Sequence, residues 1–277
     1  MKHDDFGNRM KAFESVYTDA RIPIELPMMV RVDGKGFSKF TKGFNKPFDD
    51  DLSGAMIAMT KQLVKETGAD FGYTQSDETS LVFFPRGKQS EHYLGGKVSK
   101  VNSIVASMAS VTFNHFIMKS SPIAMASRGL PYFDCRVWSV DSDVEAMNTM
   151  LWRMQDAKRN SISSLCHNTM GHKKMQNLSG DTMISTMKAD YSVDWFSIPA
   201  RYRFGTIVTK VAELTELDAD IVATIPVDKR PIENMVIRNK IYEEHAGKFM
   251  SSTIEERLSM MLHPNSARLS EELTNND

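Results

Sequence analysis

The sequence predicts an α+β fold of the ferredoxin-like type, a split βαββαβ unit, with a helical C-terminal extension. Two observations carry this prediction. Short apolar runs bounded by turn residues alternate with segments whose apolar residues recur at helical spacing, and the resulting order is strand, helix, strand, strand, helix, strand. At 277 residues the chain exceeds the usual size of a single core. We therefore expect a core over residues 1–140 and a mixed, mainly helical extension over residues 141–277 that completes the same unit.

Each element of the unit has its own local signal. The apolar run 26–32 predicts the first strand, which the following glycines end. Three acids at 49–51 open a helix with a periodic apolar face, and the segment 97–118 has the same periodicity. The remaining strands are expected at 71–75 and 79–84, joined by a tight turn, and at 132–140.

Composition limits the class of protein more than its function. The formal net charge of −1 gives no global basic field, so a polyanionic partner must be held by a local patch. Cys135 and Cys166 are too few for a disulfide framework, which indicates a reducing compartment. Neither a signal-type apolar stretch at residues 1–10 nor a run of membrane-spanning length is present, so we expect a cytoplasmic protein without membrane contact.

Two carboxylates are brought together by the predicted fold. Asp33 follows the first strand and Asp77 precedes the third, and these two strands are antiparallel neighbours in a split βαββαβ sheet. Carboxylates at close range repel unless a cation lies between them. Hard divalent ions, above all Mg²⁺, bind such oxygens together with substrate phosphates, and two ions about 4 Å apart can assist phosphoryl transfer.

The glycines beside the first acid fit the same chemistry. Gly34 and Gly36 allow the backbone to approach a ligand closely, and successive turn amides form a concavity suited to a triphosphate. The alternative is ordinary turn chemistry, since Asp-Gly is a common turn dipeptide and the stretch 76–78 is an ordinary polar hairpin tip.

Five ordered stretches carry a resemblance to a known family. They are RVDGKGFSKF (31–40), NKPFDDDL (45–52), GYTQSDETSLVF (72–83), YFDCRVW (132–138) and WRMQDAKRNSI (152–162). They resemble successive motifs of the tRNA(His) guanylyltransferase family, most closely its Thg1-like branch from bacteria, archaea and phages. The resemblance implies a palm-type polymerase core over residues 1–140 with two Mg²⁺ ions, ATP and GTP as substrates, and tRNA as a partner. It also implies a homotetramer that adds nucleotides to the tRNA 5′ end in the 3′-to-5′ direction.

The resemblance assigns roles to residues of this chain. Asp33 and Asp77 match the two metal-binding carboxylates, which are also the catalytic residues, and Gly34 matches a backbone carbonyl ligand. The nucleotide-binding positions are Asp33, Gly34, Lys35, Gly36, Phe37, Ser38, Lys46, Ser76, Asp77, Lys97 and Lys100. For the last two lysines, a solvated helix face is the alternative interpretation.

A second basic cluster is a candidate RNA contact. It consists of Lys158, Arg159, His172, Lys173 and Lys174, on and after the long helix expected to begin at Asp143. Basic side chains at this density can contact RNA phosphates, although charge at a helix end is also a routine dipole effect.

One departure from the family bears on the substrate. Eukaryotic members carry His-Ile-Asn-Asn where this chain has the stretch KRNS at 158–161. Templated repair of 5′-truncated tRNA therefore fits better than obligatory guanylate addition to tRNA(His).

Several positions keep two interpretations. Glu78 is either a hairpin-tip acid or a metal ligand, and Asp134 either supports the metal site or pairs with Arg136. Further along, RYRFGTIVTKVAEL (201–214) indicates one or two strands, KRPIENMVIRNKIYEEH (229–245) a loop leading to a helix, and SEELTNND (270–277) a frayed acidic tail. Two other function classes stay open: a palm-fold nucleotidyl cyclase acting on mononucleotides, and an RNA-binding protein without turnover.

Overall fold

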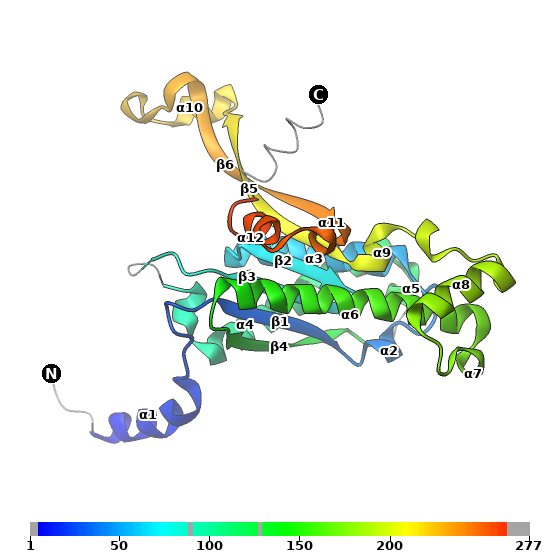
Figure 1. Ribbon diagram of the computed structural model, residues 1–277. Coiled ribbons are helices and arrows are strands. Elements are labelled where there is room, and N and C mark those ends of the chain that lie inside the picture. The colour runs from blue at the N-terminus through cyan, green and yellow to red at the C-terminus, as the bar shows by residue number, and fades with distance from the viewer. Residues whose placement is uncertain (1–4, 88–90, 127–128, 265–277) are drawn as a thin grey trace.

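The centre of the molecule is one six-stranded antiparallel sheet, seen in a computed structural model that describes residues 5–87, 91–126 and 129–264. The strand order is β4-β1-β3-β2-β5-β6 (Figure 1). The strands are β1 (Met28–Lys35), β2 (Phe71–Gln75), β3 (Glu78–Phe83), β4 (Tyr132–Ser139), β5 (Thr206–Glu216) and β6 (Met235–His245). The order of the first four strands is that of a split βαββαβ unit, so the predicted fold class is confirmed.

Helices cover both faces of this sheet. On one face α3 (Asp50–Thr67) and α4 (Val98–Ser120) enclose a core with β1 and β3. On the other face α6 (Asp143–Met170), with α11 (Gly247–Ser251) and α12 (Ile254–Leu262), encloses a second core. The shorter elements are α1 (Asp5–Thr18), α2 (Phe37–Phe40), α5 (Pro122–Met125), α7 (His172–Met175), α8 (Gly180–Tyr191), α9 (Ala200–Phe204), α10 (Ala219–Thr224) and four 3₁₀ turns, η1 (Tyr93–Gly96), η2 (Trp195–Ser197), η3 (Val227–Lys229) and η4 (Ile232–Asn234).

Strand β1 shows how the sequence divides the two faces. Val30 and Val32 are fully buried in the core with α3 and α4, whereas Met29 is buried in the core with α6. Arg31 and Asp33 follow Met29 at a spacing of two, so they share its face. Toward Asp33 the α6 face of the sheet therefore changes from apolar to charged.

The helix boundaries follow from local capping. Asp49 caps α3, because its carboxylate accepts a hydrogen bond from the Leu52 amide at 3.0 Å. Helix α6 was expected to begin with Asp143 as its cap, but Ser142 is the capping residue and accepts from the Glu145 amide. Asp143 instead lies in the first turn, where its charge favours the positive end of the helix dipole.

The region beyond residue 200 differs from the sequence prediction. Residues 201–204 belong to helix α9, which ends at Gly205 in the left-handed region (φ 82°), and only the following residues form β5. The helix predicted within 229–245 is wrong, because residues 235–245 form β6 and pair with β5 along eleven positions. The outer half of this hairpin projects from the body as an arm (Figure 1), so both of its faces are exposed and it lacks the alternation typical of a half-buried strand.

Strands β5 and β6 extend the same sheet that β1–β4 begin. The division at residue 140 therefore separates two parts of the chain that share one sheet, and it stays a prediction as a domain boundary. Within the described residues, none of the helices combines the length and the apolar character needed to cross a membrane. The predicted frayed tail, residues 270–277, lies outside the described residues.

Candidate active site

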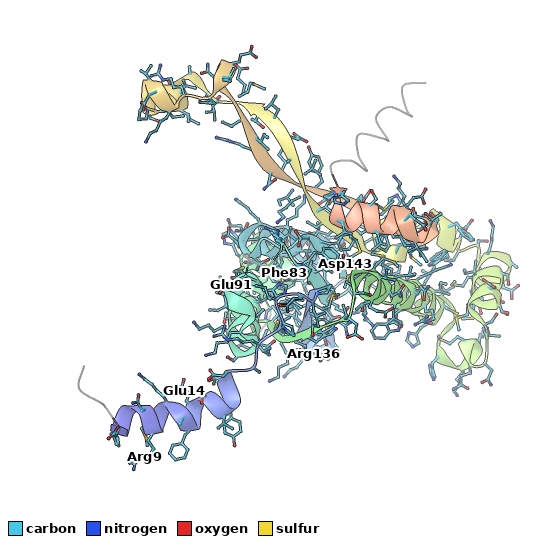
Figure 2. The ribbon with its side chains drawn as sticks, turned by 60° about the vertical axis from the view of Figure 1, so that its left-hand side comes forward. Arg9, Glu14, Phe83, Glu91, Arg136 and Asp143 are labelled. Atoms are coloured by element: carbon cyan, nitrogen blue, oxygen red, sulfur yellow. The ribbon has the colours of Figure 1, made fainter. Side chains whose placement is uncertain are left out.

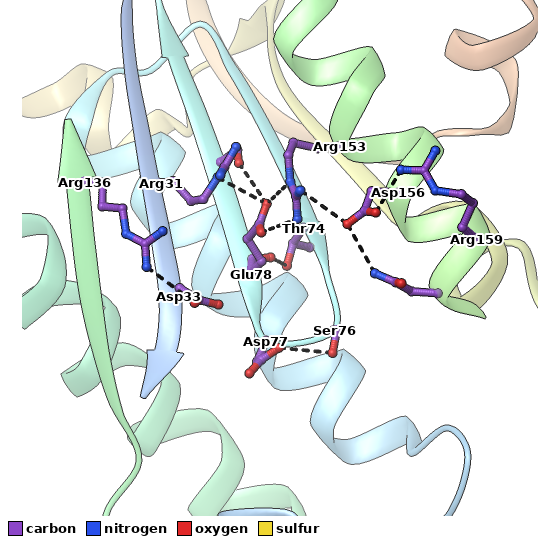
Figure 3. Close-up of polar contacts among 12 residues, drawn as sticks. Arg31, Asp33, Thr74, Ser76, Asp77, Glu78, Arg136, Arg153, Asp156 and Arg159 are labelled. Carbon is purple, nitrogen blue, oxygen red and sulfur yellow. Dashed lines mark hydrogen bonds and ion pairs between the residues drawn. The ribbon is translucent and has the colours of Figure 1, made fainter. Parts of the chain in front are cut away.

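The two predicted carboxylates lie at one end of the β1–β3 pair. Asp33 lies inside β1 rather than after it, opposite Glu78 of β3 and Asp134 of β4. Asp77 lies in the two-residue turn between β2 and β3, and its carbonyl accepts a hydrogen bond from the Gly34 amide at 3.0 Å. That hydrogen bond ties the turn to β1, so Asp33 and Asp77 lie beside each other, as Figure 3 shows.

The local electrostatics disfavour two bare negative charges. Burial raises the pKa of Asp33, and the negative charges of Asp77, Glu78 and Asp134 raise it further, opposed by Arg136. Burial likewise raises the pKa of Asp77, although its own backbone amide and the Ser76 hydroxyl oppose this effect. A bound cation would relieve this repulsion.

The loop after Asp33 is shaped by glycine. A Cβ atom at Gly34 would lie 2.3 Å from the Phe37 ring, so no other residue fits there without moving the ring. Gly36 precedes α2 in the left-handed conformation (φ 69°), which most residues adopt only with strain. Phe37 itself is 4% exposed and packs against Phe133 with a ring distance of 5.0 Å. It therefore anchors the loop to the core, while Lys35 and Ser38 are exposed.

A pocket of about 530 Å³ opens beside these carboxylates. Six of the residues assigned by the family resemblance line it: Asp33, Phe37, Ser38, Lys46, Ser76 and Asp77. This volume lies within the usual range for small-molecule sites. The structure thus brings the two acids, the start of α2 and one exposed lysine to a single cavity, whereas Gly34, Lys35 and Gly36 are not among its lining residues.

Part of the pocket wall was missed from the sequence. Arg153, Asn160 and Ser164 come from one side of α6, and Arg201 and Tyr202 come from α9. The first two lie in the stretch 152–162, which was noted only for its resemblance. No signal in the sequence marks the residues of α9, because they reach the pocket through contacts with distant parts of the chain, namely α6, Phe48 and Asp50.

Glu78 holds α6 against the sheet. Its carboxylate accepts two hydrogen bonds from the Arg153 guanidinium, at 2.8 and 2.5 Å, and forms an ion pair with Arg31 at 3.4 Å (Figure 3). Both side chains of the Glu78–Arg153 pair are only 17% exposed. Of its two interpretations, the structural one is favoured, since two arginines already occupy its oxygens.

The other acid with two interpretations lies at the edge of the sheet. Asp134 forms an ion pair with Arg136 at 3.5 Å, and Arg136 also approaches Asp33 at 3.9 Å. Asp134 does not line the pocket. It acts on Asp33 through its charge and through the arginine that they share.

Lys97 and Lys100 lie at the opposite end of the sheet. Lys97 caps α4 and forms an ion pair with Asp19 at 3.1 Å. Phe113, sixteen residues further along α4, is the one that packs against the loop at Phe37. With a rise of 1.5 Å per residue, this separates the lysine end of α4 from the pocket end by about 24 Å. Neither lysine lines the pocket of the same chain, and their role in triphosphate binding stays a prediction.

The basic candidates for RNA binding extend from the pocket along α6. Lys158 is exposed, and Arg159 is exposed but paired with Asp156 at 2.9 Å. His172, Lys173 and Lys174 are exposed on α7, immediately after α6, and Lys174 donates a hydrogen bond to the Tyr191 hydroxyl. The two groups are separated by about 20 Å of helix.

The chain is similar to a known protein family and to solved structures. The family model described as tRNAHis guanylyltransferase (Thg1) matches residues 7–141. A bacterial Thg1-like protein solved in complex with ATP is 32% identical, with a TM-score of 0.69, covering 74% of this chain and 88% of that one. Another such structure, in complex with GTP, is 28% identical with a TM-score of 0.67 and covers 92% of this chain and 95% of that one.

Curated sequences give the same result. A probable tRNA(His) guanylyltransferase from Drosophila melanogaster is 24% identical over 265 residues, covering 90% of this chain and 88% of the relative. Uncharacterized protein R259 from Acanthamoeba polyphaga mimivirus is 33% identical over 228 residues, covering 75% of this chain and 78% of the relative.

The sheet and its matches define a palm-type enzyme of the nucleotidyltransferase class. More narrowly, the chain belongs to the tRNA(His) guanylyltransferase (Thg1) family.

Proposed function

We propose that this protein is a Mg²⁺-dependent 3′-to-5′ nucleotidyltransferase that repairs the 5′ end of tRNA. In the first step the 5′-phosphate of the RNA attacks the α-phosphate of ATP or GTP and releases pyrophosphate. In the second step the 3′-hydroxyl of an incoming nucleoside triphosphate attacks the activated 5′-phosphate and releases AMP or GMP. The observation that carries the proposal is the pocket, which combines two adjacent carboxylates with Phe37 and Ser38 at the start of α2, directly after the glycine loop.

The donor set fits Mg²⁺. Asp33 and Asp77 would supply carboxylate oxygens and Gly34 a backbone carbonyl, which are the hard ligands that Mg²⁺ prefers. In the described part of the chain no three His, Cys, Asp or Glu side chains are grouped to hold an ion. The remaining positions would thus be left to phosphate and water oxygens, as is usual for Mg²⁺ sites in phosphoryl-transfer enzymes. When bound, two such ions would stabilise charge on the reacting phosphoryl oxygens.

The residues of the pocket have separate roles in this proposal. Lys46 is exposed at the pocket wall, and no acid among the described residues lies within ion-pair distance of it, so its ammonium group can bind a phosphate. The hydroxyls of Ser38 and Ser76 and the amides of residues 35–37 would complete the cradle for the triphosphate.

The RNA would approach along α6. Lys158 lies between Ala157 and Asn160, which both line the pocket, and the basic residues of α7 lie about 20 Å further along. Such contacts hold a phosphate backbone without reading its bases. Base pairing with the opposite strand of the acceptor stem must then choose the incoming nucleotide.

We also propose that the homotetramer expected from the family resemblance forms partly through α1. This helix has no buried residue, and the apolar side chains of Phe6, Met10, Phe13 and Tyr17 are 40–87% exposed along one stripe. Figure 2 shows the helix standing away from the body. Its C-terminal end lies beside Lys97, since the Val98 amide donates to Ala20. A second copy that covers this stripe would lie near Lys97 and Lys100. In this arrangement the two lysines would bind a triphosphate held in the pocket of the second copy.

The experiment combines the protein with Mg²⁺, ATP, labelled GTP and a tRNA that lacks its first nucleotide. The template base opposite the gap is changed to each of the four bases, each nucleoside triphosphate is supplied in turn, and the added residue is sequenced. We expect the added base to follow its Watson–Crick partner. Addition of G opposite every base would replace repair with tRNA(His)-type guanylate addition. A cyclic mononucleotide formed without RNA would indicate the cyclase alternative, and no product of either kind would indicate a silent RNA-binding protein.

A further inference from the structure

An exposed tryptophan lies beside the proposed active site without a role in it. Trp152 is 51% exposed on α6, although the neighbouring residues Met150 and Met154 are fully buried. It is absent from the pocket wall. A large apolar side chain exposed next to a reaction site is a candidate contact for a ligand.

The ring is held in place by charged neighbours. The Arg153 guanidinium carbon lies 4.8 Å from the Trp152 ring centre, and that of Arg31 lies 5.6 Å from it and 5.3 Å from the Trp138 ring. Glu78 binds both arginines. Arg31, Trp138, Trp152 and Arg153 together form what we call the tryptophan–arginine platform.

The platform lies on the same face of the sheet as Asp33. Arg31 is two residues before Asp33 on β1, so the two Cα atoms are separated by about 7 Å. Arg136 lies opposite Arg31 on β4, is 61% exposed and approaches the Asp33 carboxylate. The strip from Asp33 to Trp152 thus offers one half-exposed aromatic ring and one exposed guanidinium.

These two groups suit the end of a nucleic acid. An aromatic ring stacks on any base whose face is free, and an exposed guanidinium binds a phosphate. Bases within a duplex are already stacked on both sides, so the free faces belong to unpaired nucleotides. A protein partner would not explain why the ring contacts Arg31, which lies two residues before one of the carboxylates proposed to act on an RNA end.

We propose that Trp152 stacks on the first unpaired base of the 3′ extension of the acceptor stem, and that Arg136 binds the adjoining phosphate. This inference rests on the proposed function, because it assumes that the 5′ end of the same stem lies at Asp33 and Asp77. It adds a subsite for single-stranded RNA to the pocket for the triphosphate.

The test uses three acceptor-stem RNA duplexes: one with a four-nucleotide 3′ extension, one with the first base of that extension abasic, and one blunt. Affinities are measured by fluorescence anisotropy. For the wild-type chain we expect the abasic RNA to bind about tenfold more weakly than the extended RNA. This arm needs no variant, so a folding defect cannot affect it.

Variants then assign the effect to the platform. Trp152→Ala should weaken binding of the extended RNA about tenfold and leave the abasic and blunt RNAs unchanged, whereas Trp152→Phe should stay within about threefold. Phe196→Ala is the matched control, since this residue is 61% exposed on η2. Equal losses on all three RNAs, or no loss from Trp152→Ala, would overturn the inference. If the wild-type chain bound RNA through Trp152 but added no nucleotide, the proposed function alone would fail.

Discussion

Strand β1 and the adjacent helix α4 carry acidic side chains at one end and basic side chains at the other. At one end Asp33 and Asp77 crowd against each other beside a pocket and are only partly exposed. At the other end Lys97 occupies the N-cap position of α4, near helix α1, which has no buried residue. The acid end lines a pocket formed by residues of one chain, whereas neither Lys97 nor Lys100 lines that pocket. A residue that matches a family motif therefore need not lie at the same pocket as the other matching residues of its chain.

The largest expected effect tests the acid end. Asp33→Asn or Asp77→Asn should lower the rate of nucleotide addition about a thousandfold, because the stabilisation supplied by bound metal ions amounts to several kcal/mol. The thermal unfolding midpoint should be unchanged or higher, since one of two repelling groups is removed. Single-turnover addition to a 5′-truncated tRNA measures the rate.

Asp134→Asn is the matched control for this pair. Asp134 contributes to the same row of acids but lies outside the pocket. We expect its rate to stay within about threefold of the wild-type rate. An equal loss in all three variants would mean that the total charge of the row matters and not the pair.

The second prediction concerns the link between the acid end and α6. Arg153→Met should lower the free energy of unfolding by about 3 kcal/mol, because Glu78 would lose the closer of its two cationic partners in a mostly buried site. Adding Glu78→Gln in the same chain should recover part of this loss. Urea unfolding followed by circular dichroism measures both variants.

Arg159→Met serves as the control for Arg153→Met. Arg159 is 61% exposed, and its pair with Asp156 should contribute less than about 1 kcal/mol. If the two variants were equally stable, the Glu78–Arg153 pair would have no special role in attaching α6.

The smallest expected effect compares the lysines of the two ends. Lys46→Ala should weaken binding of a non-hydrolysable ATP analogue about tenfold in any assembly state, because Lys46 lines the pocket of its own chain. Lys100→Ala should weaken binding only in the assembled protein. Calorimetric titration gives the affinity and sedimentation equilibrium the mass.

The Phe13→Glu variant provides unassembled protein in which the two lysine variants can be compared. Phe13 is 66% exposed, so a charge there should prevent contact between copies and change the free energy of unfolding by less than about 0.5 kcal/mol. If Lys100→Ala weakened ATP binding as much as Lys46→Ala in this background, the separation of the two ends would be wrong.

The first four strands could be predicted because their signals are local. Gly36 directly follows β1, the two-residue turn at Ser76 and Asp77 joins β2 and β3, and the acids at 49–51 open α3. These short-range rules, combined with the known order of a split βαββαβ sheet, were enough to place Asp33 beside Asp77.

The sequence predictions failed for elements whose structure depends on packing between residues far apart in the chain, or on the absence of such packing. Segment 235–245 has Ile237 and Ile241 four residues apart, which suits a helix, but pairing with β5 determines its structure. Tyr202 reaches the pocket because its ring stacks on Phe48 at 4.8 Å, a contact between residues 154 positions apart (202 − 48). No short-range pattern can report such a contact.

In the hairpin of β5 and β6, one edge of β6 pairs with no other strand among the described residues. Strand β6 is the last strand of the sheet, and an open edge of eleven residues can pair with the edge of another molecule and begin aggregation. Charged residues interrupt this edge at Arg238, Lys240, Glu243 and Glu244. Because charges on an edge oppose such pairing, the protein can extend its sheet into solvent and remain dispersed at the concentrations that a cell requires.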